Sequence, residues 1–312
     1  MKRDILIDIL IALLCLLSLA ALAQEKCYYF AQGERQGSAT PYGNNTSVGQ
    51  YVQADDARLY YETYGEGSPL FVLHGGGVGS PYELGELIDS LRAQQRYKVF
   101  VISTRGHGRS ELGHRKMSLE QRAKDMSAVI RQLAPNQKVS LVGFSDGAYT
   151  SMSIAVFYPE LAERIVAIGA GTVKAGYMSA EVKVSDWETA DKRFYNQQRL
   201  LMPEPDRWQE FATDYMGYWN HLNLGKDFFS RIQCPILMMT GDEDDHAPIQ
   251  TVVDAYYMAP KAQLSRSRWD RYLGMTAPMT QVPVPTATPA PWHPCLRTSS
   301  TLPQPCSRNT IP

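Results

Sequence analysis

Short apolar runs alternate along the middle of the chain with longer stretches in which apolar residues recur every three or four positions. The apolar runs lie at residues 69–73, 98–103, 139–142, 164–169 and 235–240. Runs of this length, bounded by turn residues, are typical of strands that are buried on both faces. The stretches with helical spacing include residues 82–95, 118–133 and 249–258. Strands that alternate with helices in this way predict an α/β fold with a doubly wound, mostly parallel sheet.

The sheet is expected to begin with residues 57–64, where Leu59 and Tyr61 alternate with more polar neighbours. Alternation with a period of two is typical of a strand. A glycine-containing turn at residues 65–67 follows, and the first of the apolar runs comes directly after it. We therefore expect a hairpin to open the domain.

The sequence GFSDG at residues 143–147 directly follows one of the predicted strands and precedes a stretch with helical spacing. In a G-x-S-x-G turn the serine occupies a sharp corner between strand and helix, and the two glycines remove Cβ atoms that would collide with neighbouring backbone. The hydroxyl of Ser145 would then stand above the sheet at a helix N-terminus, where N–H groups favour developing negative charge. Ser145 is therefore a candidate nucleophile.

Two glycine-rich loops precede this turn, and each comes directly after a predicted strand. HGGG occupies residues 74–77 and RGHGRS occupies residues 105–110. A glycine-rich loop of this kind can bring a backbone N–H close to a ligand. Together with GFSDG, these motifs in this order resemble the α/β-hydrolase superfamily, in particular its small esterase, lactonase and cofactor-free peroxidase-like members. The resemblance covers roughly residues 50 to 262.

The resemblance implies roles for four residues. Ser145 would attack an acyl carbon, and the N–H groups of Gly76 and Asp146 would hold the oxyanion. In similar hydrolases the acid of the catalytic triad lies in a G-D-x-D-x-x-x-P loop after a buried strand, and this pattern maps onto Asp244. The alternatives for Asp244 are a cap for the following helix or a solvated acidic loop. A metal site at residues 244–246 has less support, because its ligand-type residues crowd one short loop, and we expect neither a metal nor a cofactor.

The histidine that should complete the triad is missing from its expected place. A serine hydroxyl needs an imidazole held between it and the acid. Relatives place this histidine after the last strand, but downstream of Asp244 the sequence has only His246 and His293. His246 is two residues from the acid in the same loop, and His293 lies in a proline-rich tract. Both are therefore poor candidates for the base.

The sequence changes character beyond residue 264. Pro, Thr, Ser and Ala dominate there, no acidic residue follows Asp270, and neither a strand period nor a helix period survives. We interpret residues 265–312 as a disordered or out-of-frame tail that leaves the fold without its last helix. A frameshift and a genuine variant with a disordered tail both remain open.

Residues 172–230 are expected to form a helical cap inserted between two strands, at the point where relatives place a cap over the active site. The segment is rich in large aromatic residues, among them Trp187, Phe194, Tyr195, Trp208, Phe211, Tyr215, Tyr218 and Trp219. These side chains would form an apolar pocket above the serine, or only the cap's own core.

The N-terminus has the pattern of a secretory signal peptide. Two basic residues precede an apolar run from residue 9 to residue 23, and an A-x-A sequence at residues 21–23 offers a cleavage site. An uncleaved anchor is the alternative, because two acidic residues lie unusually close to the apolar run. We expect the protein to be secreted or periplasmic. The predicted organisation is a signal peptide at residues 1–23, a flexible leader at residues 24–50, and a hydrolase domain at residues 51–264.

The chain of 312 residues has a formal net charge of −1. This gives no reason to expect nucleic acid, or a membrane surface, as a partner of the mature protein. The cysteines that remain after cleavage are scattered and suggest neither a disulfide framework nor a zinc site. We expect a small ester or lactone as substrate, and a monomer or a homodimer.

These observations together predict an exported serine hydrolase that cleaves carboxylic esters or lactones through an acyl-enzyme. A dehalogenase is disfavoured, because its nucleophile would be an aspartate where this chain has Ser145. The alternative is a catalytically impaired hydrolase that binds a small apolar ligand, because the triad histidine is missing.

Overall fold

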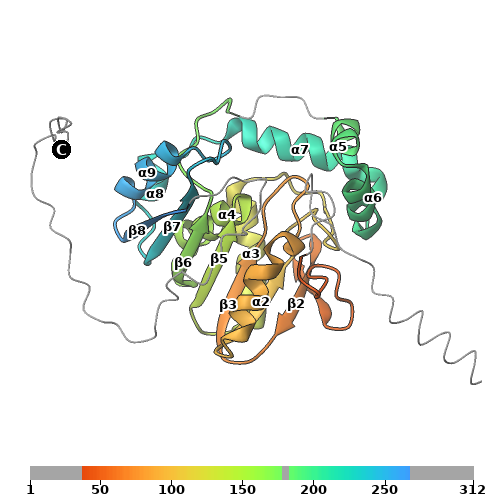
Figure 1. The fold of residues 1–312 in the computed structure, drawn as a ribbon, viewed down its shortest axis with the longest axis horizontal. Coiled ribbons are helices and arrows are strands. Elements are labelled where there is room, and N and C mark those ends of the chain that lie inside the picture. The colour runs from red at the N-terminus through yellow and green to blue at the C-terminus, as the bar shows by residue number, and fades with distance from the viewer. Residues whose placement is uncertain (1–36, 178–182, 268–312) are drawn as a thin grey trace, which may run out of the picture. The chain divides into compact units, whose positions relative to one another are not determined.

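The computed structural model describes residues 37–177 and 183–267, whose core is an eight-stranded sheet (Figure 1). The strand order is β1-β2-β4-β3-β5-β6-β7-β8. The strands are β1 (Gly49–Ala54), β2 (Ala57–Tyr64), β3 (Ser68–Leu73), β4 (Tyr97–Ile102), β5 (Val139–Phe144), β6 (Ala162–Ile168), β7 (Ile236–Gly241) and β8 (Ala262–Ser267). β2 pairs antiparallel with both β1 and β4, and the other pairs are parallel. The predicted doubly wound, mostly parallel α/β sheet is confirmed.

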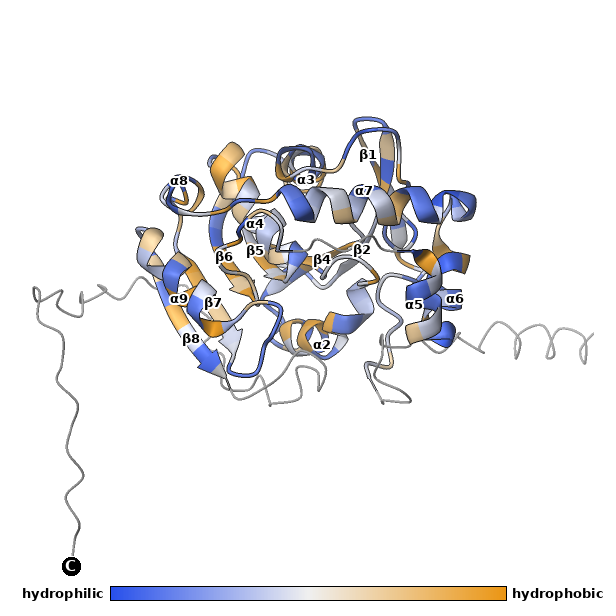
Figure 2. Ribbon diagram, turned by 90° about the horizontal axis from the view of Figure 1, so that it is seen from above, coloured by the Kyte–Doolittle hydropathy of each residue, from blue (hydrophilic) through white to orange (hydrophobic). Residues whose placement is uncertain are grey.

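Helices cover both faces of this sheet. α3 (Leu119–Leu133), α4 (Asp146–Phe157) and α9 (Ile249–Met258) lie on one face, and α2 (Gly85–Ala93) lies on the other, after the 3₁₀ turn η1 (Pro81–Leu84) (Figure 2). Right-handed crossovers explain this division, because the chain steps toward one edge from β3 to β4 and toward the opposite edge in every step from β4 onward. α3 begins where the sequence predicts, since the Ser118 hydroxyl accepts a hydrogen bond from the Gln121 N–H at 3.0 Å.

The segment between β6 and β7 is helical. It contains α5 (Val184–Ala190), α6 (Lys192–Leu201), the 3₁₀ turn η2 (Pro205–Arg207), α7 (Trp208–His221) and α8 (Lys226–Phe229). α7 lies above the sheet in the view of Figure 1, with α5 and α6 beyond its N-terminal end. Trp208 packs edge-on against Tyr195 and Trp187, with ring centroids 5.7 and 6.3 Å apart. These aromatics form the cap's own core, whereas Phe211 and Tyr215 face the main domain.

The predicted opening hairpin is wrong in its pairing. β2 does not pair with β3 across the turn at Gly65 and Gly67; it pairs with β4, and β3 lies on the far side of β4. The two glycines have φ angles of 70° and 116°, and this turn carries the chain past β4. The strand that forms a hairpin with β2 is β1. The sequence did not reveal β1, because three of its six residues are exposed and are polar or aromatic.

The predicted flexible leader is wrong for residues 37–50. Tyr42 is 1% exposed, and its hydroxyl donates a hydrogen bond to Asp89 on α2 at 2.6 Å. The N–H of Asn45 donates to the buried carboxylate of Glu62 on β2 at 2.7 Å. Contacts of this kind anchor a segment whose overall composition is polar, and composition alone does not reveal them.

Several predictions fall outside the described residues. They are the signal peptide at residues 1–23, the first part of the leader, and the tail from residue 268 onward. β8 continues through Ser267, so regular structure extends past the predicted boundary at residue 264. Among the helices that the structure describes, we find none with the length and apolar character needed to cross a membrane.

Candidate active site

Ser145 is the single residue between the end of β5 and the start of α4. Its backbone has φ 51° and ψ −117°, a conformation that a non-glycine residue rarely adopts. Strained backbone of this kind concentrates at functional sites, where the surrounding structure holds it in place. The chain therefore makes the sharp strand-to-helix corner that the GFSDG sequence predicts.

The two glycines of this turn are required by close backbone contacts. A Cβ at Gly143 would lie 2.3 Å from the carbonyl oxygen of Gly147, and a Cβ at Gly147 would lie 2.3 Å from that of Leu73. Real Cβ atoms do not approach backbone oxygens so closely. The second contact also shows that the start of α4 packs directly against the end of β3, where the HGGG loop begins.

The two residues predicted to hold the oxyanion lie side by side. Asp146 is the first residue of α4, where the helix N-terminus favours negative charge. A Cβ at Gly76 would lie 2.7 Å from Oδ2 of Asp146 and 1.8 Å from the hydroxyl oxygen of Tyr215 on α7. The structure thus brings the HGGG loop, the serine turn and the cap helix together at one place.

Asp244 follows β7 and is 4% exposed. Its Oδ1 atom accepts hydrogen bonds from the N–H groups of His246 and Ala247, both at 3.0 Å. These bonds fix the carboxylate in its loop. They also fit the alternative of a helix cap, because they lie just ahead of α9.

Ser145 and Asp244 emerge at the same edge of the sheet. β5 and β7 flank β6 in parallel register, with Phe144 opposite Ile168 and Ile168 opposite Met239. Two strand spacings separate β5 from β7, which is roughly 10 Å. This separation leaves room for an imidazole between the serine and the acid.

His74 and His107 are buried near the serine turn but act as supports of the loops. Nε2 of His74 accepts a hydrogen bond from the Thr104 N–H at 3.1 Å, and burial lowers the pKa of His74 to about 3. Burial also lowers the pKa of His107 well below its usual value, and its ring packs edge-on against Phe211 of the cap at 5.0 Å. Both imidazoles are therefore neutral at physiological pH.

His246 is held by its neighbour in the same loop. Its Nδ1 atom pairs with the exposed Asp245 carboxylate at 2.7 Å, on the same loop. The possible ligand atoms of Asp244, Asp245 and His246 lie within 4.8 Å of one another. Neighbours in one loop crowd together in this way without a metal, so the cluster adds no independent support for one. His293 lies outside the described residues.

A buried ion pair lies directly beside the serine turn, and sequence reasoning missed it. Arg122 on α3 pairs with Asp146, and the side chains are 2% and 0% exposed. Burial raises the pKa of Asp146, and the neighbouring guanidinium opposes that shift. The sequence feature that could have indicated this ion pair is Arg122 itself, which lies within the apolar face of α3 near Leu119 and Met126. An arginine there needs a buried partner, but the sequence does not say which.

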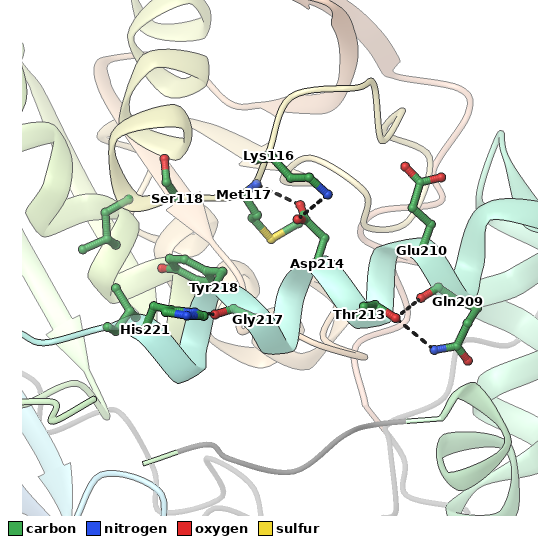
Figure 3. A pocket seen from close by; sticks show the side chains of 12 residues that line it. Lys116, Met117, Ser118, Gln209, Glu210, Thr213, Asp214, Gly217, Tyr218 and His221 are labelled. Atoms are coloured by element: carbon green, nitrogen blue, oxygen red, sulfur yellow. Dashed lines mark hydrogen bonds and ion pairs between the residues drawn. The ribbon is translucent and has the colours of Figure 1, made fainter. Parts of the chain in front are cut away.

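A pocket of about 710 Å³ opens between α7 and the residues that lead into α3 (Figure 3). Its lining comprises Lys116, Met117, Ser118, Leu119, Gln209, Glu210, Thr213, Asp214, Gly217, Tyr218, His221 and Leu222. Asp214 ties the two sides together, because its carboxylate accepts from the Met117 N–H at 2.8 Å and pairs with Lys116 at 3.2 Å. Ser145 is not part of this lining, but Tyr218 both lines the pocket and contacts Asp146.

Part of the chain matches a family model of known sequences. Residues 69–202 match the family model of the alpha/beta hydrolase fold, a span that contains all three glycine-rich motifs. The chain has the α/β-hydrolase fold. The resemblance inferred from the motifs is confirmed.

Its relatives are hydrolases with differing substrates. The human serine hydrolase BPHL is 27% identical over 229 residues, which are 69% of this chain and 76% of that protein. A 2-hydroxy-6-oxo-6-(2'-aminophenyl)hexa-2,4-dienoic acid hydrolase from Metapseudomonas resinovorans is 27% identical over 225 residues, 65% of this chain and 77% of that enzyme. The crystal structure of the enol-lactonase from Burkholderia xenovorans LB400 has a TM-score of 0.58 at 17% identity, covering 70% of this chain and 91% of the enzyme. The last likeness concerns the fold alone.

Proposed function

We propose that this protein is an exported serine hydrolase that cleaves carboxylic esters or lactones through an acyl-enzyme. The observation that carries the proposal is the strained conformation of Ser145 at the N-terminus of α4, whose first residue, Asp146, lies beside Gly76. A serine held in this way has its hydroxyl clear of the strand, with backbone donors on the side where negative charge develops.

The reaction begins when Oγ of Ser145 attacks the acyl carbon and gives its proton to a base. The carbonyl oxygen becomes an oxyanion, which the N–H groups of Gly76 and Asp146 stabilise. Collapse of this intermediate expels the alcohol and leaves an acyl-serine, and water then releases the acid. Asp244 orients the imidazole that carries the proton and stabilises its charged form.

The ester or lactone preference is supported by the chain's relatives as well as by its chemistry. The human relative is named a serine hydrolase, and one structural neighbour is an enol-lactonase. Another relative hydrolyses a hexadienoic acid derivative, so the family alone does not fix the bond cleaved. Esters and lactones need only a nucleophile, a base and an oxyanion hole, and the proposed roles of Ser145, Gly76 and Asp146 cover the first and the last of these.

A fluorophosphonate probe tests the proposal directly, because it reacts only with an activated serine. We expect covalent labelling that peptide mapping assigns to Ser145, together with hydrolysis of short p-nitrophenyl esters. Labelling at another serine, or none in a folded protein, would contradict the proposal. Ser145→Ala is the matched control, since it removes one oxygen atom.

A second candidate is a hydrolase that binds a small apolar ligand without turnover. The sequence has only His246 and His293 downstream of Asp244, and neither has the expected surroundings of a triad histidine; this observation favours the second candidate. An inert Ser145 combined with saturable binding of an apolar ligand would support this candidate over the enzyme.

A further inference from the structure

One helix of the cap contacts both residues of the proposed oxyanion hole. Tyr215 and Tyr218 are three positions apart on α7, so their side chains share one face of the helix. The Tyr215 hydroxyl fills the space beside Gly76, where a Cβ would lie only 1.8 Å from it. The Tyr218 hydroxyl donates a hydrogen bond to Oδ1 of Asp146 at 3.4 Å.

The side-chain carboxylate of Asp146 lies next to the proposed oxyanion hole, where a second negative charge is unfavourable. Its side chain is fully buried, and its own N–H is one of the two proposed donors to the oxyanion. An uncompensated negative charge here would repel the charge that develops on the substrate, and little water is present to screen it. The hole therefore requires a buried positive charge beside Asp146.

Arg122 supplies this charge, and three elements hold it in place. Its Nε donates to the Thr150 hydroxyl on α4 at 3.0 Å, and Nη1 contacts the sulfur of Met117 at 3.6 Å. Its guanidinium carbon lies 5.9 Å from the ring centroid of Tyr218, so the cap's aromatic ring lies over the cation. The ion pair is thus enclosed between α3, α4 and α7.

We propose that Arg122 and Tyr218 are positioning residues that couple the cap to the oxyanion hole. Arg122 neutralises Asp146 and fixes the start of α4, and Tyr218 completes this arrangement only when α7 is seated on the domain. Movement of the cap away from the sheet would remove the phenol from Asp146 and loosen the N–H that faces the oxyanion. This inference rests on the proposed role of Ser145 and of the Gly76 and Asp146 donors.

The test compares Tyr218→Phe with Tyr195→Phe. Both tyrosines are buried in the cap, at 7% and 5% exposure, but Tyr195 packs in the cap's own core. We expect Tyr218→Phe to slow fluorophosphonate labelling of Ser145 by about tenfold, because a hydrogen bond to a charged group is lost. Hydrogen exchange of the α7 amides should become faster. Tyr195→Phe should change neither quantity, and equal effects of the two variants would overturn the proposal.

A second comparison tests the part played by the charge. Arg122→Met with Asp146→Asn removes both charges together, which avoids leaving one charge buried without a partner. In this background, Tyr218→Phe should slow labelling by about threefold or less, because its acceptor is now neutral. An unchanged tenfold effect would exclude coupling through Asp146.

The exchange measurement separates this inference from the proposed function. If the wild-type protein does not label at Ser145, the proposed hydrolase activity fails. The exchange of α7 still reports on the contact between Tyr218 and Asp146 in that case. Faster exchange of the α7 amides in Tyr218→Phe, but not in Tyr195→Phe, would support the coupling between the cap and the serine turn. The same exchange rate in both variants would refute it.

Discussion

The backbone N–H of Ser145 donates a hydrogen bond to the carbonyl oxygen of Ile168, 2.7 Å away at the end of β6. This bond lies one residue past the end of β5 and extends its pairing with the neighbouring strand into the turn. It satisfies the N–H of a residue whose φ is positive. The sheet itself therefore helps to maintain the strained conformation of the candidate nucleophile.

Replacing the serine should abolish the activity. In Ser145→Ala we expect hydrolysis of short p-nitrophenyl esters to fall by a factor on the order of 10³ or more, because the covalent route is lost. Unchanged hydrolysis would show that the turn is not the active site. Ser145→Gly provides a structural control: it should be about 1 kcal/mol more stable to urea than Ser145→Ala, because glycine adopts positive φ without strain.

Activity should depend on the carboxylate of Asp244 and not on that of its neighbour Asp242. Asp244→Asn should lower ester hydrolysis by roughly 10²-fold or more, because it removes the charge that stabilises the imidazolium. Asp242→Asn is the matched control. The Asp242 side chain is 21% exposed and pairs with Arg266 at 3.3 Å, away from the Asp244 hydrogen bonds. Damage from Asp242→Asn with Asp244→Asn silent would move the acid to the earlier position.

The strands and the serine turn were predictable because their causes are local. Buried parallel strands appear as continuous apolar runs, and the turn before α4 needs glycines at fixed offsets from Ser145. β1 could not be found in this way, since an exposed edge strand has no apolar run to reveal it. Tyr42 likewise gave no sign that it packs against α2, because one buried residue has no period.

Parts of the site that depend on contacts between distant elements were not predictable. Arg122 and Asp146 are close only because α3 and α4 pack against each other, and Tyr218 reaches them from the cap. The apolar pattern of α3 shows that position 122 is buried, but it cannot identify the partner. The imidazole base is undetermined for a different reason, because no downstream histidine has the expected surroundings in the sequence.

Acid should destabilise the protein through His74 and His107. The pKa of His74 is about 3 in the folded state, below its usual value of 6.5, so the unfolded chain binds more protons between these limits. Stability is therefore lost as the pH falls below about 6.5. His74 should contribute about 1.4 kcal/mol of loss between pH 7.5 and 5.5, as measured by urea denaturation, and His107 should act in the same direction.

The contribution of His74 can be isolated with one variant. His74→Gln should reduce the loss of stability between the two pH values by about 1.4 kcal/mol. His114→Gln, at an exposed histidine, is the control for the general effect of the substitution. A reduction of the same size in that control would argue against the assignment to His74.

The mature protein should begin at Gln24. The basic N-terminus, the apolar run and the A-x-A sequence at residues 21–23 predict cleavage at that point during export. Mass spectrometry of secreted or periplasmic material determines the N-terminal residue. Recovery of the chain from the membrane fraction with Met1 intact would instead support an uncleaved anchor.

Gly76 should not tolerate even a methyl group. In Gly76→Ala the new Cβ would lie 1.8 Å from the Tyr215 hydroxyl and 2.7 Å from Oδ2 of Asp146, so the HGGG loop, α7 or both must move. We expect ester hydrolysis to fall by about 10²-fold or more, because one oxyanion donor is displaced. The free energy of unfolding should also fall, by about 1–3 kcal/mol, since the contact is overpacked.

Gly217→Ala is the matched control for this substitution, because it makes the same chemical change within α7. No atom lies within 4 Å of the position that its Cβ would occupy. Alanine is favoured over glycine inside a helix, so Gly217→Ala should raise the stability by about 0.5–1 kcal/mol and leave hydrolysis unchanged. The two variants should therefore shift the urea midpoint in opposite directions. If Gly76→Ala instead retains full activity and stability, Tyr215 does not close on the HGGG loop, and the cap does not contact the oxyanion hole at that residue.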